Sequence, residues 1–149
     1  MKKFQFTLDK MRSYTEQILD EEKNTLSVLK QVQFQIEFKI ARLEKSFADI
    51  SLELREDERK GIEAALLRGY NLQLTSIRNQ LKELRFELKK ATREVEKQME
   101  KVVAASKEVS KLDKLEEKQY EEYQKTVAKT EELFIDEFVS SDLIRKGAV

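Results

Sequence analysis

Apolar side chains recur along the first third of the chain at alternating spacings of four and three residues. Weaker positions of the same stripe hold Thr15, Glu22 and Thr25. The apolar members are Phe4, Leu8, Met11, Ile18, Leu29, Val32 and Ile36. Because this is the seven-residue period of a coiled coil, the stripe predicts one long helix with a single buried seam.

The stripe changes phase near its middle. After Val32 and Ile36 it steps by four residues to Ile40. It then continues through Leu43, Phe47, Ile50 and Leu54. This spacing predicts a stutter that locally unwinds the supercoil, and the alternative is a seam that drifts to a neighbouring face. Phe34 and Phe38 lie off the seam, so they either flank the stutter or bind a partner.

The second half of the chain carries a cleaner stripe with no change of phase. Its members are Ile77, Leu81, Leu84, Leu88, Ala91, Val95, Gln98, Val102, Ala105, Val109 and Leu112. Weaker continuations run upstream and downstream through Leu66, Tyr70, Gln73, Glu116, Gln119, Tyr123, Thr126 and Thr130. The pattern predicts a second helix whose packed part ends near Leu115.

A run of charged residues ending in Gly61 separates the two stripes and is the best turn candidate. A helix with one apolar seam cannot bury it alone, and the short connection favours pairing within the chain. The sequence therefore predicts an all-α fold, a long two-helix antiparallel coiled-coil hairpin with an overhanging C-terminal helix. We expect a single domain over residues 1–149, with helix 1 at about 4–55, the turn at about 56–62, helix 2 at about 63–140 and a C-terminal tail at 141–149.

The second predicted helix outruns the first. With the turn centred near Arg59, residue 4 lies opposite roughly residue 114, so roughly 25 residues of the second helix lack a partner. This overhang carries Tyr120, Tyr123, Phe134 and Phe138 among many acidic residues. Large aromatic side chains on an unpartnered helix favour a docking surface, and the alternative is an end that bends back or frays.

Near the predicted turn, an apolar cluster is broader than one seam requires. It consists of Leu66, Leu67, Tyr70, Leu72 and Leu74, and Gly69 lies within it. The cluster either closes the end of the hairpin or meets a partner.

The amino-acid composition excludes most kinds of catalytic and metal-binding site. The chain has no Cys and no His, so thiolate nucleophiles, zinc–thiolate sites and the usual catalytic triads are excluded. We expect no enzymatic activity, no catalytic residues, no metal site and no cofactor. The chain has 29 basic and 29 acidic residues, which argues against nucleic acid as a partner of the whole molecule. It also has no proline, which favours uninterrupted helices.

Charge is nevertheless unevenly distributed along the second helix. Residues 64–101 hold nine basic and five acidic residues, whereas residues 108–142 hold five basic and eleven acidic ones. Blocks of opposite sign orient partners, although a solvated face would give the same pattern. The chain reaches Asp9 before any apolar run of signal-peptide length, and no stretch is apolar enough to span a bilayer, so the expected compartment is the cytoplasm.

Two segments carry a family resemblance. Residues 111–123, KLDKLEEKQYEEY, are followed by residues 134–138, FIDEF, and the chain opens with a basic and aromatic stretch from Lys2 to Phe6. Together with Gly61-Ile62 and Tyr70, their order and spacing resemble the FliJ family of the bacterial flagellar export apparatus.

The resemblance implies a stalk-like coiled coil that binds the export ATPase FliI, promotes assembly of its ring and contacts the export gate protein FlhA. Export chaperones are further implied partners, and the implied location is peripheral, at the inner face of the membrane. The ATPase-side residues would be Tyr120, Tyr123, Phe134, Asp136, Glu137 and Phe138. The gate-side residues would be Tyr70, Leu72, Gln73, Leu74 and Ile77. A scaffold or chaperone-like hairpin unrelated to flagella is the alternative function.

Overall fold

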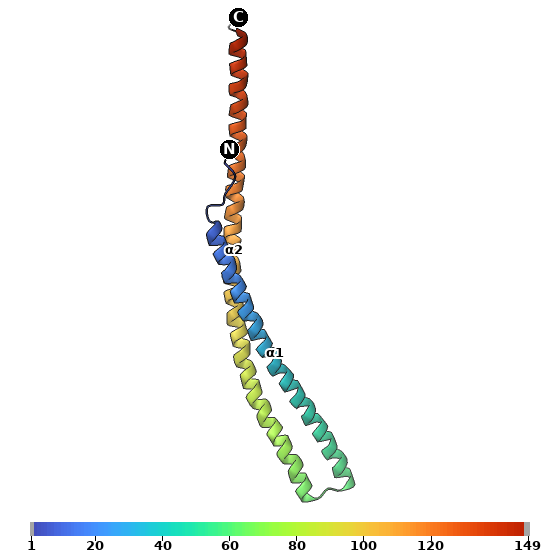
Figure 1. Ribbon diagram of the computed structural model, residues 1–149. Coiled ribbons are helices and arrows are strands. Elements are labelled where there is room, and N and C mark those ends of the chain that lie inside the picture. The colour runs from blue at the N-terminus through green and yellow to red at the C-terminus, as the bar shows by residue number, and fades with distance from the viewer. Residues whose placement is uncertain (1, 148–149) are drawn as a thin grey trace. The chain divides into compact units, whose positions relative to one another are not determined.

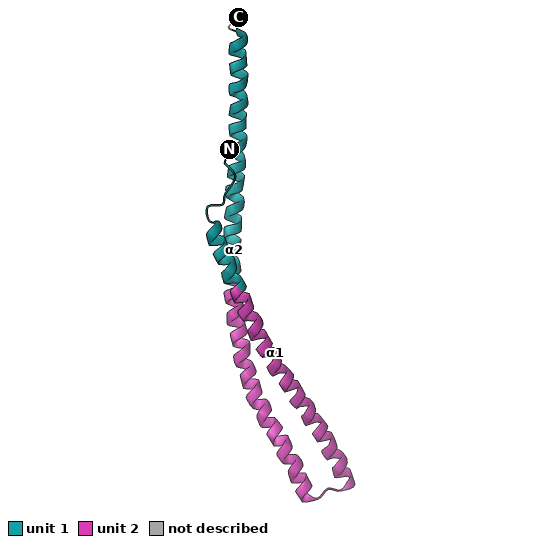
Figure 2. Cartoon of the chain, viewed as in Figure 1, with its two compact units in different colours: residues 1–20, 104–149 teal, residues 21–103 magenta. Residues whose placement is uncertain are grey.

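The computed structural model describes residues 2–147, and its regular structure there consists of two helices (Figure 1). Helix α1 spans Asp9–Lys60 and helix α2 spans Ala64–Gly147. The chain is therefore an all-α helical hairpin, as the sequence predicts. It divides into two compact units, residues 1–20 with 104–149 (unit 1) and residues 21–103 (unit 2), which are described separately (Figure 2). The prediction of a single domain stays a prediction.

The helices begin and end later than the sequence pattern indicated. The charged residues from Arg55 to Lys60 belong to α1, and the turn consists of Gly61, Ile62 and Glu63 alone. Charged side chains do not interrupt a helix, because Arg, Lys and Glu are good helix formers. At the other end, residues 141–147 continue α2 and form no separate tail, while residues 148–149 lie outside the described part of the chain.

Gly61 ends α1. Its φ is +88°, a left-handed conformation that costs a residue with a Cβ about 1–2 kcal/mol. The Gly61 amide donates to the Glu58 carbonyl at 3.3 Å, which closes the last turn of the helix. Glu63 then opens α2 by accepting a hydrogen bond from the Leu67 amide at 3.0 Å.

In unit 2, α1 and α2 pack antiparallel along one seam (Figure 2). The core centres on Ile40, Ile77 and Leu81. Partly buried neighbours extend it, namely Ile36, Leu43, Phe47, Ile50, Leu84 and Leu88. Among the described residues no side chain is completely enclosed, because each seam residue is covered by only one facing helix. The free energy of folding therefore depends on the sum of small contributions from many partly buried positions.

The first seam keeps one phase throughout, so the predicted stutter is wrong. Met11 is 57% exposed and Val32 is 44% exposed. Ile18 and Ser51 are partly buried beside the seam. The seam of α1 itself runs through Arg12, Thr15, Leu19, Glu22, Leu26, Leu29, Gln33, Ile36, Ile40, Leu43, Phe47, Ile50, Leu54 and Asp57. Their spacing alternates strictly between four and three. Phe34 and Phe38 accordingly lie on the exposed side of α1 and flank no stutter.

The second seam confirms the predicted positions from Ile77 to Leu112, all of which are buried or partly buried. Its continuations differ from the predicted ones. Upstream it uses Leu67, Tyr70 and Leu74 and leaves Leu66 and Gln73 exposed. Downstream it continues through Glu116, Gln119, Tyr123 and Val127, well past Leu115.

Polar side chains of the seam in unit 2 meet polar partners on the other helix. The Gln98 amide donates to the Glu22 backbone carbonyl at 3.0 Å and also to its carboxylate. The Gln33 amide donates to the Thr92 hydroxyl at 3.2 Å. No buried side-chain nitrogen or oxygen among the described residues lacks a partner. Since an unpaired buried polar group costs about 1–3 kcal/mol, these pairs oppose any slip of one helix against the other.

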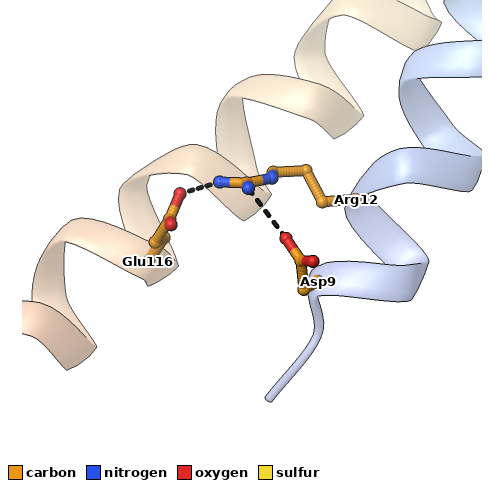
Figure 3. A network of polar contacts seen from close by, with 3 residues as sticks. All are labelled: Asp9, Arg12 and Glu116. Carbon is orange, nitrogen blue, oxygen red and sulfur yellow. Dashed lines mark hydrogen bonds and ion pairs between the residues drawn. The ribbon is translucent and has the colours of Figure 1, made fainter. Parts of the chain in front are cut away.

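Unit 1 has a similar cross-helix pair. Arg12 forms ion pairs with Glu116 of α2 and with Asp9 at the start of its own helix, so its guanidinium bridges the two helices (Figure 3). The same guanidinium lies 5.5 Å from the centre of the Phe6 ring. Phe6 is buried, although it precedes the first residue of α1. The N-terminal segment is thus packed onto α2.

We predict opposite effects for alanine at two glycines, both of which have open space where the added methyl group would lie. Gly61→Ala should destabilise the chain by about 1 kcal/mol, because alanine disfavours positive φ. Gly69→Ala, inside α2, should stabilise it by about 0.5–1 kcal/mol. Thermal unfolding followed by circular dichroism measures both, at about 3 °C per kcal/mol. Equal effects of the two substitutions would contradict this account of the turn.

Candidate partner-binding surfaces

The end of α2 in unit 1 extends beyond its partner segment. Every described residue from 128 to 147 is exposed, and we call this stretch the free end. Its large apolar side chains are Leu133, Phe134, Ile135, Phe138, Val139, Leu143 and Ile144. Large exposed apolar side chains gathered on an unpaired helix are characteristic of a protein-binding site, because water contacts them unfavourably in the unbound chain.

Two of the aromatic residues assigned to the overhang lie elsewhere. The Phe4 ring packs edge-on against Tyr120, with centroids 5.1 Å apart, and against Tyr123 at 5.5 Å. The Tyr123 hydroxyl also donates to the Lys2 carbonyl at 2.9 Å. The expected pairing of residue 4 with residues near 114 is therefore wrong, because the shorter and later turn shifts the register. Tyr120 and Tyr123 belong to the paired region, and Tyr120 keeps 45% of its surface exposed.

The predicted residues Phe134, Asp136, Glu137 and Phe138 do lie together on the free end. Phe134 is 69% exposed and Phe138 is 67% exposed. Residues 131–142 hold five acidic residues and no basic one. Asp142 forms an ion pair with Lys146 at 3.6 Å. The free end therefore combines an acidic charge with exposed aromatic and aliphatic side chains.

A second candidate surface lies at the turn in unit 2. We call it the tip, and it comprises the turn Gly61 to Glu63 with the adjoining ends of α1 and α2. The Tyr70 hydroxyl donates a short hydrogen bond to the Asp57 carboxylate, which ties the start of α2 to the last turns of α1. This hydrogen bond, together with desolvation and the nearby negative charges of Asp57 and Glu53, raises the pKa of Tyr70 to about 12. Tyr70 is therefore a structural clasp across the tip.

The other gate-side residues divide into two groups. Leu74 and Ile77 are 8% and 9% exposed and form part of the core between the helices. Leu72 is 72% exposed and Gln73 is also exposed. Leu72 lines a shallow depression with Arg68, Asn71 and Thr75, while Gln73 lines a separate one with Tyr70 and Gly69. Of the five predicted gate-side residues, only Leu72, Gln73 and part of Tyr70 are therefore accessible to a partner.

The described residues contain no group of three or more metal-ligating side chains. In that same part of the chain, neither helix has an apolar stretch of membrane-spanning length.

A protein-family model, described as the flagellar FliJ protein, matches residues 4–148. The chain belongs to the FliJ family. No curated protein and no solved structure gives a significant match to it. Family membership makes the chain a component of the flagellar export apparatus, and the family is non-enzymatic.

The heptad pattern of the sequence did not predict several exposed apolar residues of the free end. Leu133, Ile135, Val139, Leu143 and Ile144 are exposed there beside the predicted phenylalanines. They follow no single seam, so a search for one heptad stripe passes over them. The density of large apolar residues after the last seam position, Val127, is the signal that could have found them.

We predict that Tyr70 ionises about two pH units above an ordinary tyrosine. In a variant with phenylalanine at Tyr14, Tyr120 and Tyr123, ultraviolet absorbance of the remaining phenolate should show a midpoint near pH 12. Because the folded pKa lies above the unfolded value of about 10, the Tyr70 contribution to stability should be intact below pH 10 and lost as the pH rises to 12. Asp57→Ala should lower the midpoint, and an unchanged midpoint would refute the clasp.

Proposed function

We propose that this chain is a non-enzymatic link between two parts of the flagellar export apparatus. Its free end binds the ring of the export ATPase FliI and promotes ring assembly, and its tip contacts the export gate protein FlhA. Family membership supports the choice of apparatus, and the two exposed surfaces support the choice of binding regions. The location that follows is peripheral, at the cytoplasmic face of the membrane at the flagellar base, reached through these partners.

The observation that carries this proposal is the free end. The helix continues past its partner for about five and a half turns, at 3.6 residues per turn, with its aliphatic and aromatic side chains exposed. Seam residues of the paired region bury most of their apolar surface within the chain, whereas the large apolar side chains of the free end keep 48–72% of their surface exposed. A binding partner would supply the apolar burial that this end lacks, and aromatic anchors such as Phe134 and Phe138 dominate many interfaces.

The contact with the ATPase ring also has an electrostatic component. The acidic residues of the free end flank the apolar ones, and Asp136 and Glu137 lie directly between Phe134 and Phe138 in the sequence. Charged residues around an apolar centre speed association and exclude wrong partners more than they add affinity. The proposed ring surface is therefore an apolar pocket with a basic rim.

The tip presents a smaller surface to the gate. Leu72 supplies its exposed apolar side chain, and Gln73 and the outer edge of Tyr70 supply polar contacts. The clasp between Tyr70 and Asp57 holds the start of α2 in place, so little conformational freedom is lost when a partner binds. Export chaperones remain further candidate partners of these surfaces.

Coupling between the two assemblies requires no chemistry in this chain. A protein that contacts both can favour those states of each that bind it best, provided that it binds different states with different affinity. The ATPase would supply the hydrolysis, and this chain would transmit the preference of one partner to the other.

We predict that Phe134→Ala with Phe138→Ala weakens binding to purified export ATPase at least about tenfold, since an anchor residue is worth about 2 kcal/mol or more. The thermal transition should not move, because both rings are exposed. Binding is measured by titration calorimetry, and ring assembly by ATPase activity. The matched control is Phe34→Ala with Phe38→Ala, which removes two phenylalanines of the same spacing and similar exposure from α1. An equal loss in both double variants would contradict a specific role for the free end.

At the tip, we predict that alanine at Leu74 lowers stability, whereas alanine at Leu72 weakens partner binding. Leu74→Ala should destabilise unit 2 by roughly 2–4 kcal/mol, because it leaves a cavity in the core. Leu72→Ala should change stability by less than about 0.5 kcal/mol and should weaken binding to the cytoplasmic part of the gate protein. Denaturant unfolding and a pull-down measure the two effects. Normal gate binding by Leu72→Ala would remove the tip from the proposed function.

A further inference from the structure

The outer side of α2 in unit 2 carries a basic surface that the proposed function does not use. We call it the basic face, and it consists of Lys82, Arg85, Phe86, Lys89, Lys90 and Arg93. All six are exposed, because Leu81, Leu84, Leu88 and Ala91 form the seam with α1 in this stretch. Acidic residues within the same stretch are Glu83 and Glu87 only, so the face has a net positive charge.

The centre of the basic face is an exposed aromatic ring. Phe86 is 61% exposed, and the Lys90 ammonium lies 4.8 Å from its ring centroid. Lys82, Arg85 and Lys89 line a shallow groove together with this ring, and Asn79 and Glu83 complete its lining. The groove therefore offers one aromatic ring surrounded by three cations and one carboxylate, and this net positive charge suits a helix bearing both acidic and apolar side chains.

Most of the cations of this face are unneutralised. Arg85 forms an ion pair with Glu44 at 3.3 Å, and both side chains are more than half exposed. Over the described residues, no ion pair is formed by Lys82, Lys89, Lys90 or Arg93. Their charges remain available to a partner.

The same chain contains a segment of complementary chemistry. Residues 131–142, which we call the acidic segment, lie within the free end and hold five acidic residues and no basic one. Leu133, Phe134, Ile135, Phe138 and Val139 stand exposed among them. Both the acidic and the apolar character that the groove requires are thus present in one helical segment.

We propose that the acidic segment of one copy binds the basic face of a second copy. The acids face Lys82, Lys89 and Arg93 across the interface, and an apolar side chain of the segment packs on Phe86. Charge complementarity selects a second copy as the occupant, because each copy carries both halves of the interface. The contact is head-to-tail, so each bound copy keeps one unused acidic segment or one unused basic face, and association continues into short open chains.

The size of the contact sets its strength. An acidic segment of about three helical turns covers a surface at the small end of specific interfaces, so binding is weak and reversible. Electrostatic attraction contributes much of it, and screening shortens from about 10 Å at 0.1 M salt to about 3 Å at 1 M salt. Self-association would cover the same free end that is proposed to bind the ATPase, which would hold unused copies in a reserve form.

Light scattering across a concentration series tests this self-association without any partner protein. At low salt the weight-average mass should rise with concentration, and at 1 M salt it should stay at the mass of one chain. A mass that never exceeds one chain at any concentration overturns the proposal. This experiment contains no ATPase, so its failure leaves the proposed function untouched.

Charge reversal then locates the interface. Lys82→Glu with Lys89→Glu gives a face-reversed variant, and Glu132→Lys with Asp136→Lys gives a segment-reversed variant. Each alone should stay at the mass of one chain, because its reversed half no longer attracts its unmodified half. Their mixture should associate again, because the intact acidic segment of the face-reversed variant meets the intact basic face of the segment-reversed variant. Circular dichroism should show unchanged helicity in both, since all four positions are exposed.

The matched control is Lys23→Glu with Lys30→Glu, which reverses two exposed lysines of the same spacing on α1. This control should associate like the unmodified chain. Equal loss in the control would show a general effect of net charge and overturn the proposal. Loss in the segment-reversed variant alone would show that free ends bind each other, and would overturn it as well.

Discussion

Neither helix of this protein can bury its apolar seam alone, and the pairing of α1 with α2 is the constraint on which the rest of the structure depends. The seam is only one layer deep on each side, so even its best-covered members keep some contact with solvent. Burial is worth about 25 cal/mol per Å², and such partial burial stabilises the fold only when it is repeated over many turns. A long chain without proline meets this requirement, because nothing interrupts the repeat.

The polar residues of the seam decide the register in which the helices pair. Apolar seam residues are interchangeable to a degree, since Leu against Ile at one level resembles Leu against Ile one heptad further on. Gln33 with Thr92, and Glu22 with Gln98, are not interchangeable in this way. A shift by one heptad would leave their buried polar atoms unpaired, at about 1–3 kcal/mol each. The register in turn fixes which part of α2 remains without a partner in unit 1.

The polar residues of the seams also explain which parts of the fold the sequence could predict and which it could not. The second seam was predictable from Ile77 to Leu112, because nearly all of its members are apolar and keep one phase. The first seam was not, because Arg12 and Gln33 occupy partly buried positions next to the apolar but exposed Met11 and Val32. A rule that assigns every apolar residue to the core chooses the wrong neighbour there, and the predicted stutter followed from that choice. Whether a polar residue can be buried depends on its partner on the other helix, which a single stripe does not reveal.

The position of the turn could also be predicted only in part, and this affects how much of α2 is left as the free end. The charged run before Gly61 marked the turn correctly to within a few residues, but its members are good helix formers, and the helix ends only at the glycine. Each residue by which a turn moves shifts the opposite partner by two. The small error at the turn therefore moved Tyr120 and Tyr123 from the predicted overhang into contact with Phe4. The free end that remains is shorter and carries no seam residue. Its sequence is thus released from the demands of pairing, so substitutions there can leave the stability of the coiled coil unchanged.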